Sequence, residues 1–175
     1  MMDQDPRYPI GDVKAPEVIS DQDRERFMAT IRSFPALVED LVKGLDEAAL
    51  AKTYRPGGWS VRQLVHHVAD SHMNSFIRFK LTTTEDNPTI KPYYEDRWAE
   101  QPDYLLPVEP SLKILSGVHT RWVELLENLF SDDWDKEYIH PGYGKTYRLD
   151  VALALYDWHC RHHLAHLRNA LLSAS

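Results

Sequence analysis

Residues 60–79 read SVRQLVHHVADSHMNSFIRF and carry a clear helix signal. Ser60 is followed three residues later by Gln63, which makes a capping box, the local signal that starts an α-helix. Apolar side chains then recur at helical spacing and form one stripe: Val61, Leu64, Val65, Val68, Phe76 and Phe79. We therefore expect a long amphipathic helix from Ser60 to about Thr84.

The same helical pattern recurs in three other long segments, at residues 20–44, 111–130 and 151–172. Ser20 and Asp150 are the expected N-caps of the first and the last of these helices. Pro35 is a candidate kink within the first helix. A short helix is also expected at residues 46–51.

The segments between these helices are of two kinds. Residues 85–110 contain five prolines and four aromatic residues, which predicts a long crossover packed on the bundle or a lid over a site. Residues 138–147 contain two glycines and read as a small hairpin-like excursion. Residues 1–19 have no periodic pattern and predict an extended N-terminal arm. The whole chain, 1–175, is thus expected to be one all-α domain, a four-helix bundle.

Composition excludes several classes of protein. The net charge of −7 argues against nucleic acid as a partner, because phosphate-binding domains are usually basic. No apolar stretch approaches the roughly 18 residues that a membrane span needs. The first ten residues lack the pattern of a secretory signal, so a cytoplasmic location is expected. A single cysteine, Cys160, excludes an internal disulfide.

Histidine is the unusual component of the sequence. The chain has nine histidines, and none of them precedes His66. His159 and His163 are spaced i,i+4 on the last helix, and so are His162 and His166. Either spacing brings two imidazoles to one patch, where they can bind one metal ion together. Spacing alone leaves both pairs open.

A third ligand has to come from another element, and the helix of residues 60–84 supplies candidates. His72 falls within its apolar stripe, His67 lies at the flank of that stripe, and His66 points away from it. Periodicity makes His67 and His72 nearly equal third ligands, with Asp70 as a further candidate. Cys160 lies about 100° around the helix from His159, so we expect a structural thiol there.

A family resemblance bears on these alternatives. Residues 57–74, GGWSVRQLVHHVADSHMN, resemble YfiT-type members of the DinB-like superfamily, and residues 156–166 resemble their last helix. Further similarity occurs at residues 8–11, 78–81 and 140–141, whereas residues 85–110 and 141–148 match poorly. The resemblance implies a four-helix bundle, a homodimer, and one divalent ion per chain, Zn²⁺ or Ni²⁺. By the same resemblance, the ligands are His67, His159 and His163.

The chemistry of such a site leaves three functions open. YfiT-type proteins are described as metal-dependent hydrolases, in which the ion activates a water nucleophile. Some members transfer low-molecular-weight thiols such as bacillithiol to electrophiles, and a non-catalytic metal-dependent binding module is the third reading. We favour the hydrolase, acting on a small-molecule substrate. Candidate catalytic residues are Asp70, His72, His140 and His166. Candidate substrate-binding residues are Arg62, Arg78, Tyr93 and Trp98, with Lys80 as a further cation.

Overall fold

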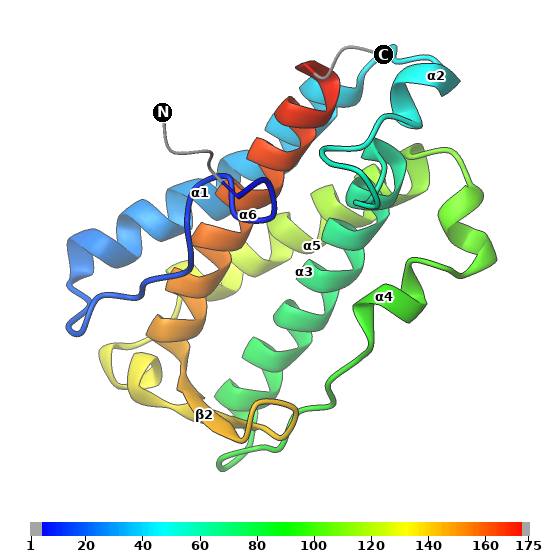
Figure 1. Ribbon diagram of the computed structural model, residues 1–175. Coiled ribbons are helices and arrows are strands. Elements are labelled where there is room, and N and C mark those ends of the chain that lie inside the picture. Colours follow the sequence, from blue (N-terminus) through cyan, green and yellow to red (C-terminus); the bar gives the residue numbers. More distant parts are fainter. Residues whose placement is uncertain (1–4, 173–175) are drawn as a thin grey trace.

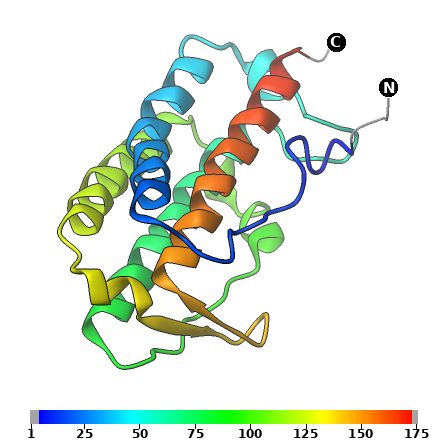
Figure 2. The same cartoon turned by 90° about the vertical axis from the view of Figure 1, so that its left-hand side faces the viewer.

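Four long helices make up most of the computed structural model, which describes residues 5–172. They are α1 (Asp21–Val42), α3 (Val61–Thr84), α5 (Glu109–Glu127) and α6 (Leu149–Leu172). Helix α1 packs against α5 and α6, and α3 packs against the same two helices, which closes the bundle (Figures 1 and 2). The all-α four-helix bundle expected from the sequence is confirmed.

Short elements connect the long helices. They are α2 (Glu47–Leu50), α4 (Glu95–Trp98), the 3-10 helices η1 (Pro102–Leu105) and η2 (Ser131–Asp135), and the strands β1 (Glu137–His140) and β2 (Lys145–Arg148). The two strands pair antiparallel, with Glu137 opposite Arg148 and His140 opposite Lys145. The hairpin predicted between the last two long helices is therefore present, and it closes one end of the bundle (Figure 1).

Two of the three helix starts predicted from capping signals are confirmed. Ser20 and Ser60 each cap a helix in a capping box, with Asp23 and Gln63 as the reciprocal partners. The N-cap expected at Asp150 is wrong, because α6 begins one residue earlier, at Leu149. The Leu149 N–H donates to the Lys136 carbonyl at 2.9 Å, so strand β2 runs directly into the helix.

The crossover of residues 85–110 lies against α3. Its Tyr104 is buried, and the hydroxyl of Tyr104 donates to the Asp70 carboxylate at 2.7 Å. His66 was expected to point away from the apolar stripe. It is in fact buried beneath this segment, with Nδ1 2.7 Å from Ser111 Oγ and Nε2 3.1 Å from the Leu106 carbonyl oxygen. The crossover thus gives α3 a second buried face.

Residues 5–19 form no helix or strand and run along α6 (Figures 1 and 2). The Trp158 indole N–H donates to the Gly11 carbonyl at 3.1 Å, and the Pro6 carbonyl oxygen lies 3.2 Å from His166 Nε2. The expected arm is therefore tied down by α6 side chains. Residues 1–4 of the predicted arm lie outside the described residues.

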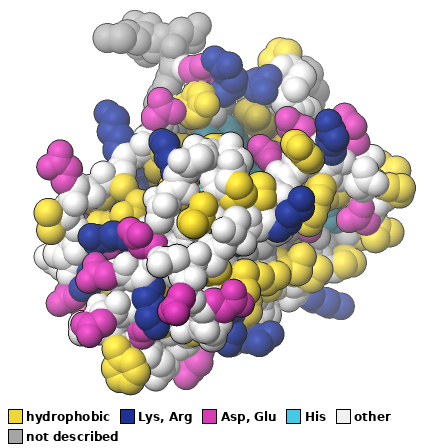
Figure 3. All heavy atoms as spheres, turned by 90° about the horizontal axis from the view of Figure 1, so that it is seen from below, with side chains coloured by type: hydrophobic (Ala, Val, Ile, Leu, Met, Phe, Trp, Pro, Cys, Tyr) yellow, Lys and Arg dark blue, Asp and Glu magenta, His cyan; other side chains and the backbone are white. Residues whose placement is uncertain are grey.

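The face of the molecule that is seen from below carries both signs of charge (Figure 3). Seen from below, acidic and basic side chains are interspersed, and histidine is visible only in recesses (Figure 3). Among the described residues, no helix combines the length and the apolar character that crossing a membrane requires.

Candidate metal centre

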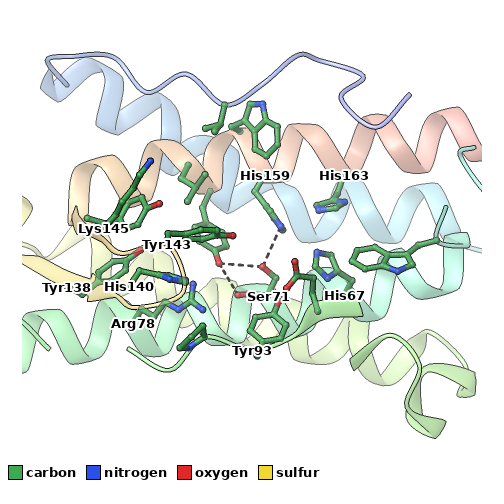
Figure 4. Close-up of a pocket in the computed structure, with 18 residues that line it drawn as sticks. His67, Ser71, Arg78, Tyr93, Tyr138, His140, Tyr143, Lys145, His159 and His163 are labelled. Carbon is green, nitrogen blue, oxygen red and sulfur yellow. Dashed lines mark hydrogen bonds between the residues drawn. The ribbon is translucent and has the colours of Figure 1, made fainter. Parts of the chain in front are cut away.

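Helices α3 and α6 bring three histidines together where the two helices face each other. His67 comes from α3, and His159 and His163 come from successive turns of α6 (Figure 4). The ring centroids lie 4.4 Å apart for His159 and His163, 4.8 Å for His67 and His163, and 5.6 Å for His67 and His159. One nitrogen from each residue lies within 4.8 Å of the others. We call these three residues the central cluster.

A second group of histidines overlaps the first. His162, His163 and His166 also offer nitrogen atoms within 4.8 Å of one another, so His163 belongs to both groups. His162 stacks on Trp158 with centroids 4.3 Å apart, and His166 stacks on Tyr54 at 3.9 Å. Both i,i+4 pairs of α6 thus lie in a cluster that could hold an ion.

Burial keeps the central cluster uncharged. Desolvation lowers the pKa of His67 to about 3 and holds the pKa of His159 and of His163 well below the usual histidine value. Neutral imidazoles are the form that binds a metal ion, and such a donor set suits Zn²⁺, Ni²⁺ or Cu²⁺. The Nδ1 atom of His67 is buried without a hydrogen-bond partner among the described residues. The cluster therefore fits a divalent ion.

Two further histidines lie behind His159. Its Nδ1 atom is 3.0 Å from His72 Nε2, and His72 Nδ1 is 2.6 Å from His119 Nε2. Nδ1 of His119 in turn lies 2.6 Å from the carbonyl oxygen of Ile31. His119 was missed from the sequence, although its position four residues after Leu115 and three before Trp122 is a signal of burial on α5.

A cavity of about 610 Å³ lies beside the central cluster, and all three histidines line it (Figure 4). Most of its other polar wall comes from the crossover and the hairpin, which supply Tyr93, Glu95, Tyr138, His140 and Lys145, and α3 supplies Arg78. This volume falls in the usual range for small-molecule sites. The cavity therefore joins a candidate metal position to two cationic side chains.

The other predicted site residues are distributed unevenly. Arg78, Tyr93 and His140 line the cavity. His72 lies behind His159. His166 lies under the N-terminal arm. Asp70 accepts from Tyr104 instead of facing the cavity.

The remaining candidates lie outside the cavity lining. Arg62 donates to the Leu105 carbonyl at 3.1 Å and pairs with Glu47. Trp98 packs on Tyr93, with ring centroids 4.5 Å apart, and so supports a residue that lines the cavity. Lys80 is exposed.

Sequence reasoning also missed polar residues of the cavity wall. Ser71, one turn after His67 on α3, has its Oγ 3.4 Å from His159 Nε2. The Tyr156 hydroxyl donates to the Ser71 carbonyl at 3.2 Å. Both positions follow from the helical spacing of the histidines, since Ser71 is i+4 from His67 and Tyr156 is i−3 from His159.

Two residues near the histidines have other roles. Cys160 is fully buried, burial raises the pKa of its thiol, and it belongs to neither histidine cluster. Asp157 accepts from the Thr30 hydroxyl at 2.6 Å and from Arg161. It therefore ties α1 to α6.

Comparison with known proteins places this geometry in a family. The profile of the DinB superfamily matches residues 30–167. The chain belongs to the DinB superfamily. Similar relatives occur in Bacillus cereus strain B4264 and Bacillus anthracis strain A0248, each 50% identical over 163 residues, or 93% of this chain and 94% of the relative. Both bear the name "Putative metal-dependent hydrolase".

A solved structure shows the same arrangement of helices. YfiT from Bacillus subtilis superimposes with a TM-score of 0.90 at 41% identity, covering 93% of this chain and 94% of that one. It is described as "a probable metal-dependent hydrolase with an unusual four-helix bundle topology". The superfamily membership and the fold expected from the resemblance are thus confirmed.

Proposed function

We propose that this chain is a metal-dependent hydrolase in which His67, His159 and His163 hold one divalent ion, Zn²⁺ or Ni²⁺. The observation that carries the proposal is the central cluster, three neutral imidazoles from two helices on the wall of a cavity of about 610 Å³. The names of the relatives and of YfiT support a metal-dependent reaction. The homodimer and the cytoplasmic location stay predictions.

The ion and the cavity residues have separate tasks in this proposal. An ion held by these three neutral imidazoles would supply Lewis acidity, which can bring the pKa of water toward about 7. His140 is the candidate proton acceptor, because burial and the nearby Arg78 lower the pKa of its imidazole and keep it neutral at neutral pH. Arg78 and Lys145 bind an anionic group of the substrate.

Transfer of a thiol is the second candidate reaction, and one observation favours it. Glu95 is the one carboxylate among the described residues that line the cavity, so the wall offers few carboxylate general bases. A thiol transferase needs less from the wall, since a thiol bound to the ion would release its proton to solvent water. The new S–C bond forms as the bond from carbon to the leaving group breaks, and the leaving group departs with the electron pair.

One assay separates the two reactions. Metal-free and Zn²⁺-loaded protein are compared on an activated aryl ester and on a halogenated aromatic electrophile, with and without added low-molecular-weight thiols. We expect Zn²⁺-dependent ester hydrolysis without thiol. His159→Gln should abolish this activity, whereas His66→Gln, at a buried histidine outside both clusters, should retain it.

The other outcomes are equally informative. Turnover that requires both Zn²⁺ and a thiol overturns the hydrolase in favour of the transferase. A protein that binds Zn²⁺ tightly and turns over neither substrate is a metal-dependent binding module. Loss of activity in His66→Gln as large as in His159→Gln would show that the assay reports folding and not the site.

A further inference from the structure

Pro35 removes one backbone hydrogen bond from α1 and leaves the Ile31 carbonyl without its helical donor. In an α-helix, the N–H of residue 35 would donate to the carbonyl of residue 31, but proline has no N–H. Ile31 is fully buried, so its carbonyl needs another donor. That donor is His119, whose Nδ1 lies 2.6 Å from the Ile31 oxygen. A proline in α1 thus leaves open an acceptor that a histidine of α5 uses.

This acceptor fixes the direction of the whole histidine chain. A carbonyl oxygen can only accept a hydrogen bond, so His119 Nδ1 must carry the hydrogen. In a neutral imidazole, His119 Nε2 then has no hydrogen and accepts through its lone pair. His72 Nδ1 lies 2.6 Å from His119 Nε2 and must therefore donate to it. This leaves His72 Nε2 without a hydrogen, as an acceptor. By the same logic His159 Nδ1 donates to His72 Nε2 at 3.0 Å. The Nε2 atom of His159 is left without a hydrogen.

We infer that Pro35, His119 and His72 are a positioning relay that fixes the tautomer of His159 and presents its Nε2 lone pair to the metal ion. The inference rests on the proposed metal site and adds three residues to it. A metal-ligating histidine usually donates its other N–H to a carboxylate or a carbonyl. Here two further histidines connect it to a carbonyl that lies on α1.

The packing around the relay leaves it one arrangement. His72 and His119 are 0% and 1% exposed, so water is excluded as a substitute partner. Phe34, the residue before Pro35, stacks on His72 and on His119, with ring centroids 5.0 and 5.7 Å apart. The Ser71 hydroxyl lies 3.4 Å from His159 Nε2 and can donate to the predicted lone pair.

The relay also connects the metal centre to the whole bundle. The hydrogen-bonded groups that it joins lie on all four long helices: Ile31 on α1, His119 on α5, His72 on α3 and His159 on α6. Reversal of the chain would put a hydrogen on His159 Nε2 and block coordination there. The Ile31 carbonyl prevents this reversal, because it cannot donate a hydrogen.

Nitrogen NMR tests the relay without metal or activity. Two-bond ¹H–¹⁵N spectra of metal-free protein, labelled with ¹⁵N in histidine, distinguish the two neutral tautomers of each ring. We expect the Nδ1–H tautomer at His159, His72 and His119. A hydrogen on Nε2 of His159 or of His72 overturns the inference. Because it uses the unmutated protein, this measurement stands even where a variant fails to fold.

Zn²⁺ affinity tests what the relay does for the site. His119→Phe keeps a ring of similar shape but removes the acceptor, and we expect it to weaken Zn²⁺ binding about 10- to 100-fold in competition with a chromophoric chelator. Pro35→Ala, which returns an N–H to the Ile31 carbonyl, should weaken Zn²⁺ binding by less and add Nε2–H tautomer at His119. His66→Phe is the matched control, since it also replaces a buried histidine, and its affinity should match the unmutated protein.

The outcomes separate this inference from the proposed function. If His119→Phe folds and binds Zn²⁺ within twofold of the unmutated protein, the relay is not a positioning device. If the unmutated protein binds no Zn²⁺ while the three Nδ1–H tautomers are present, the proposed metal site fails and the relay is a structural network only. Tight Zn²⁺ binding with reversed tautomers overturns the relay alone.

Discussion

At the scale of single residues, His163 belongs to both histidine clusters, so the choice of ligands depends on its neighbours. His159 has its Nδ1 occupied by His72 and its other nitrogen near the cavity. His166 has its Nε2 within 3.2 Å of the Pro6 carbonyl oxygen, under the N-terminal arm. Only the central cluster lines the cavity with all three of its members among the described residues. A substrate can therefore reach an ion in that cluster.

A pair of matched substitutions distinguishes the two clusters. His159→Gln should weaken Zn²⁺ binding by more than about 100-fold, since loss of a ligand exceeds the 10- to 100-fold cost of losing an outer partner. His162→Gln removes a buried histidine of the same helix and should leave Zn²⁺ affinity within a few-fold. Isothermal titration with Zn²⁺ measures both. The opposite ranking would assign the ion to His162, His163 and His166.

Helix geometry could predict the paired spacing on α6 but not which third histidine faces it. His67 and His72 are both buried on α3, and their rings lie 5.6 and 5.1 Å from the ring of His159. The two residues occupy different sides of His159, one on the cavity and one behind it. The periodicity of α3 does not indicate on which side of α3 the helix α6 lies. The sequence therefore predicted His67 and His72 as nearly equal candidates for the third ligand.

At the scale of elements, local signals predicted helix starts and distant contacts overruled one of them. The capping boxes at Ser20 and Ser60 need only residues within the same turn, and both are present. The start of α6 depends on the bond between Leu149 and Lys136, which lie on opposite sides of the hairpin. Asp150 then pairs with Arg148, and its carboxylate accepts from the Val151 N–H at 2.6 Å.

The role of Pro35 belongs to the same scale. From the sequence it was a candidate kink, and the structure keeps α1 as one helix from Asp21 to Val42 with the proline inside it. The Ile31 carbonyl, which lacks a donor within α1, accepts a hydrogen bond from His119 because α5 packs beside it. Such a pairing, between residues 88 positions apart, cannot be read from the local pattern of either helix.

At the scale of the whole molecule, burial lowers the pKa of all nine histidines. Histidines of the unfolded chain have a pKa of about 6.5. Below that pH the unfolded chain takes up protons more readily than the folded protein does. The histidines therefore do not reduce the free energy of unfolding above about pH 6.5. Below that pH, the free energy of unfolding decreases as the pH decreases.

Urea unfolding of the metal-free protein measures this dependence. Each histidine that stays neutral in the folded protein should cost about 1.4 kcal/mol of stability per pH unit below 6.5. We expect stability at about pH 5.5 to be several kcal/mol lower than at about pH 7.5. His119→Phe, with one buried histidine fewer, should show a smaller loss. Equal stability at the two pH values would contradict the burial of uncharged histidines.

The crystal structure of the Zn²⁺-loaded protein, with anomalous difference density recorded on both sides of the zinc absorption edge, tests the metal centre most directly. We expect one zinc peak per chain, with one nitrogen each of His67, His159 and His163 about 2.0–2.1 Å from it. The Nε2 atom should be the ligand from His159, and its Nδ1 should stay bonded to His72. A peak at His162 and His166, or no peak within reach of His67, would contradict the account.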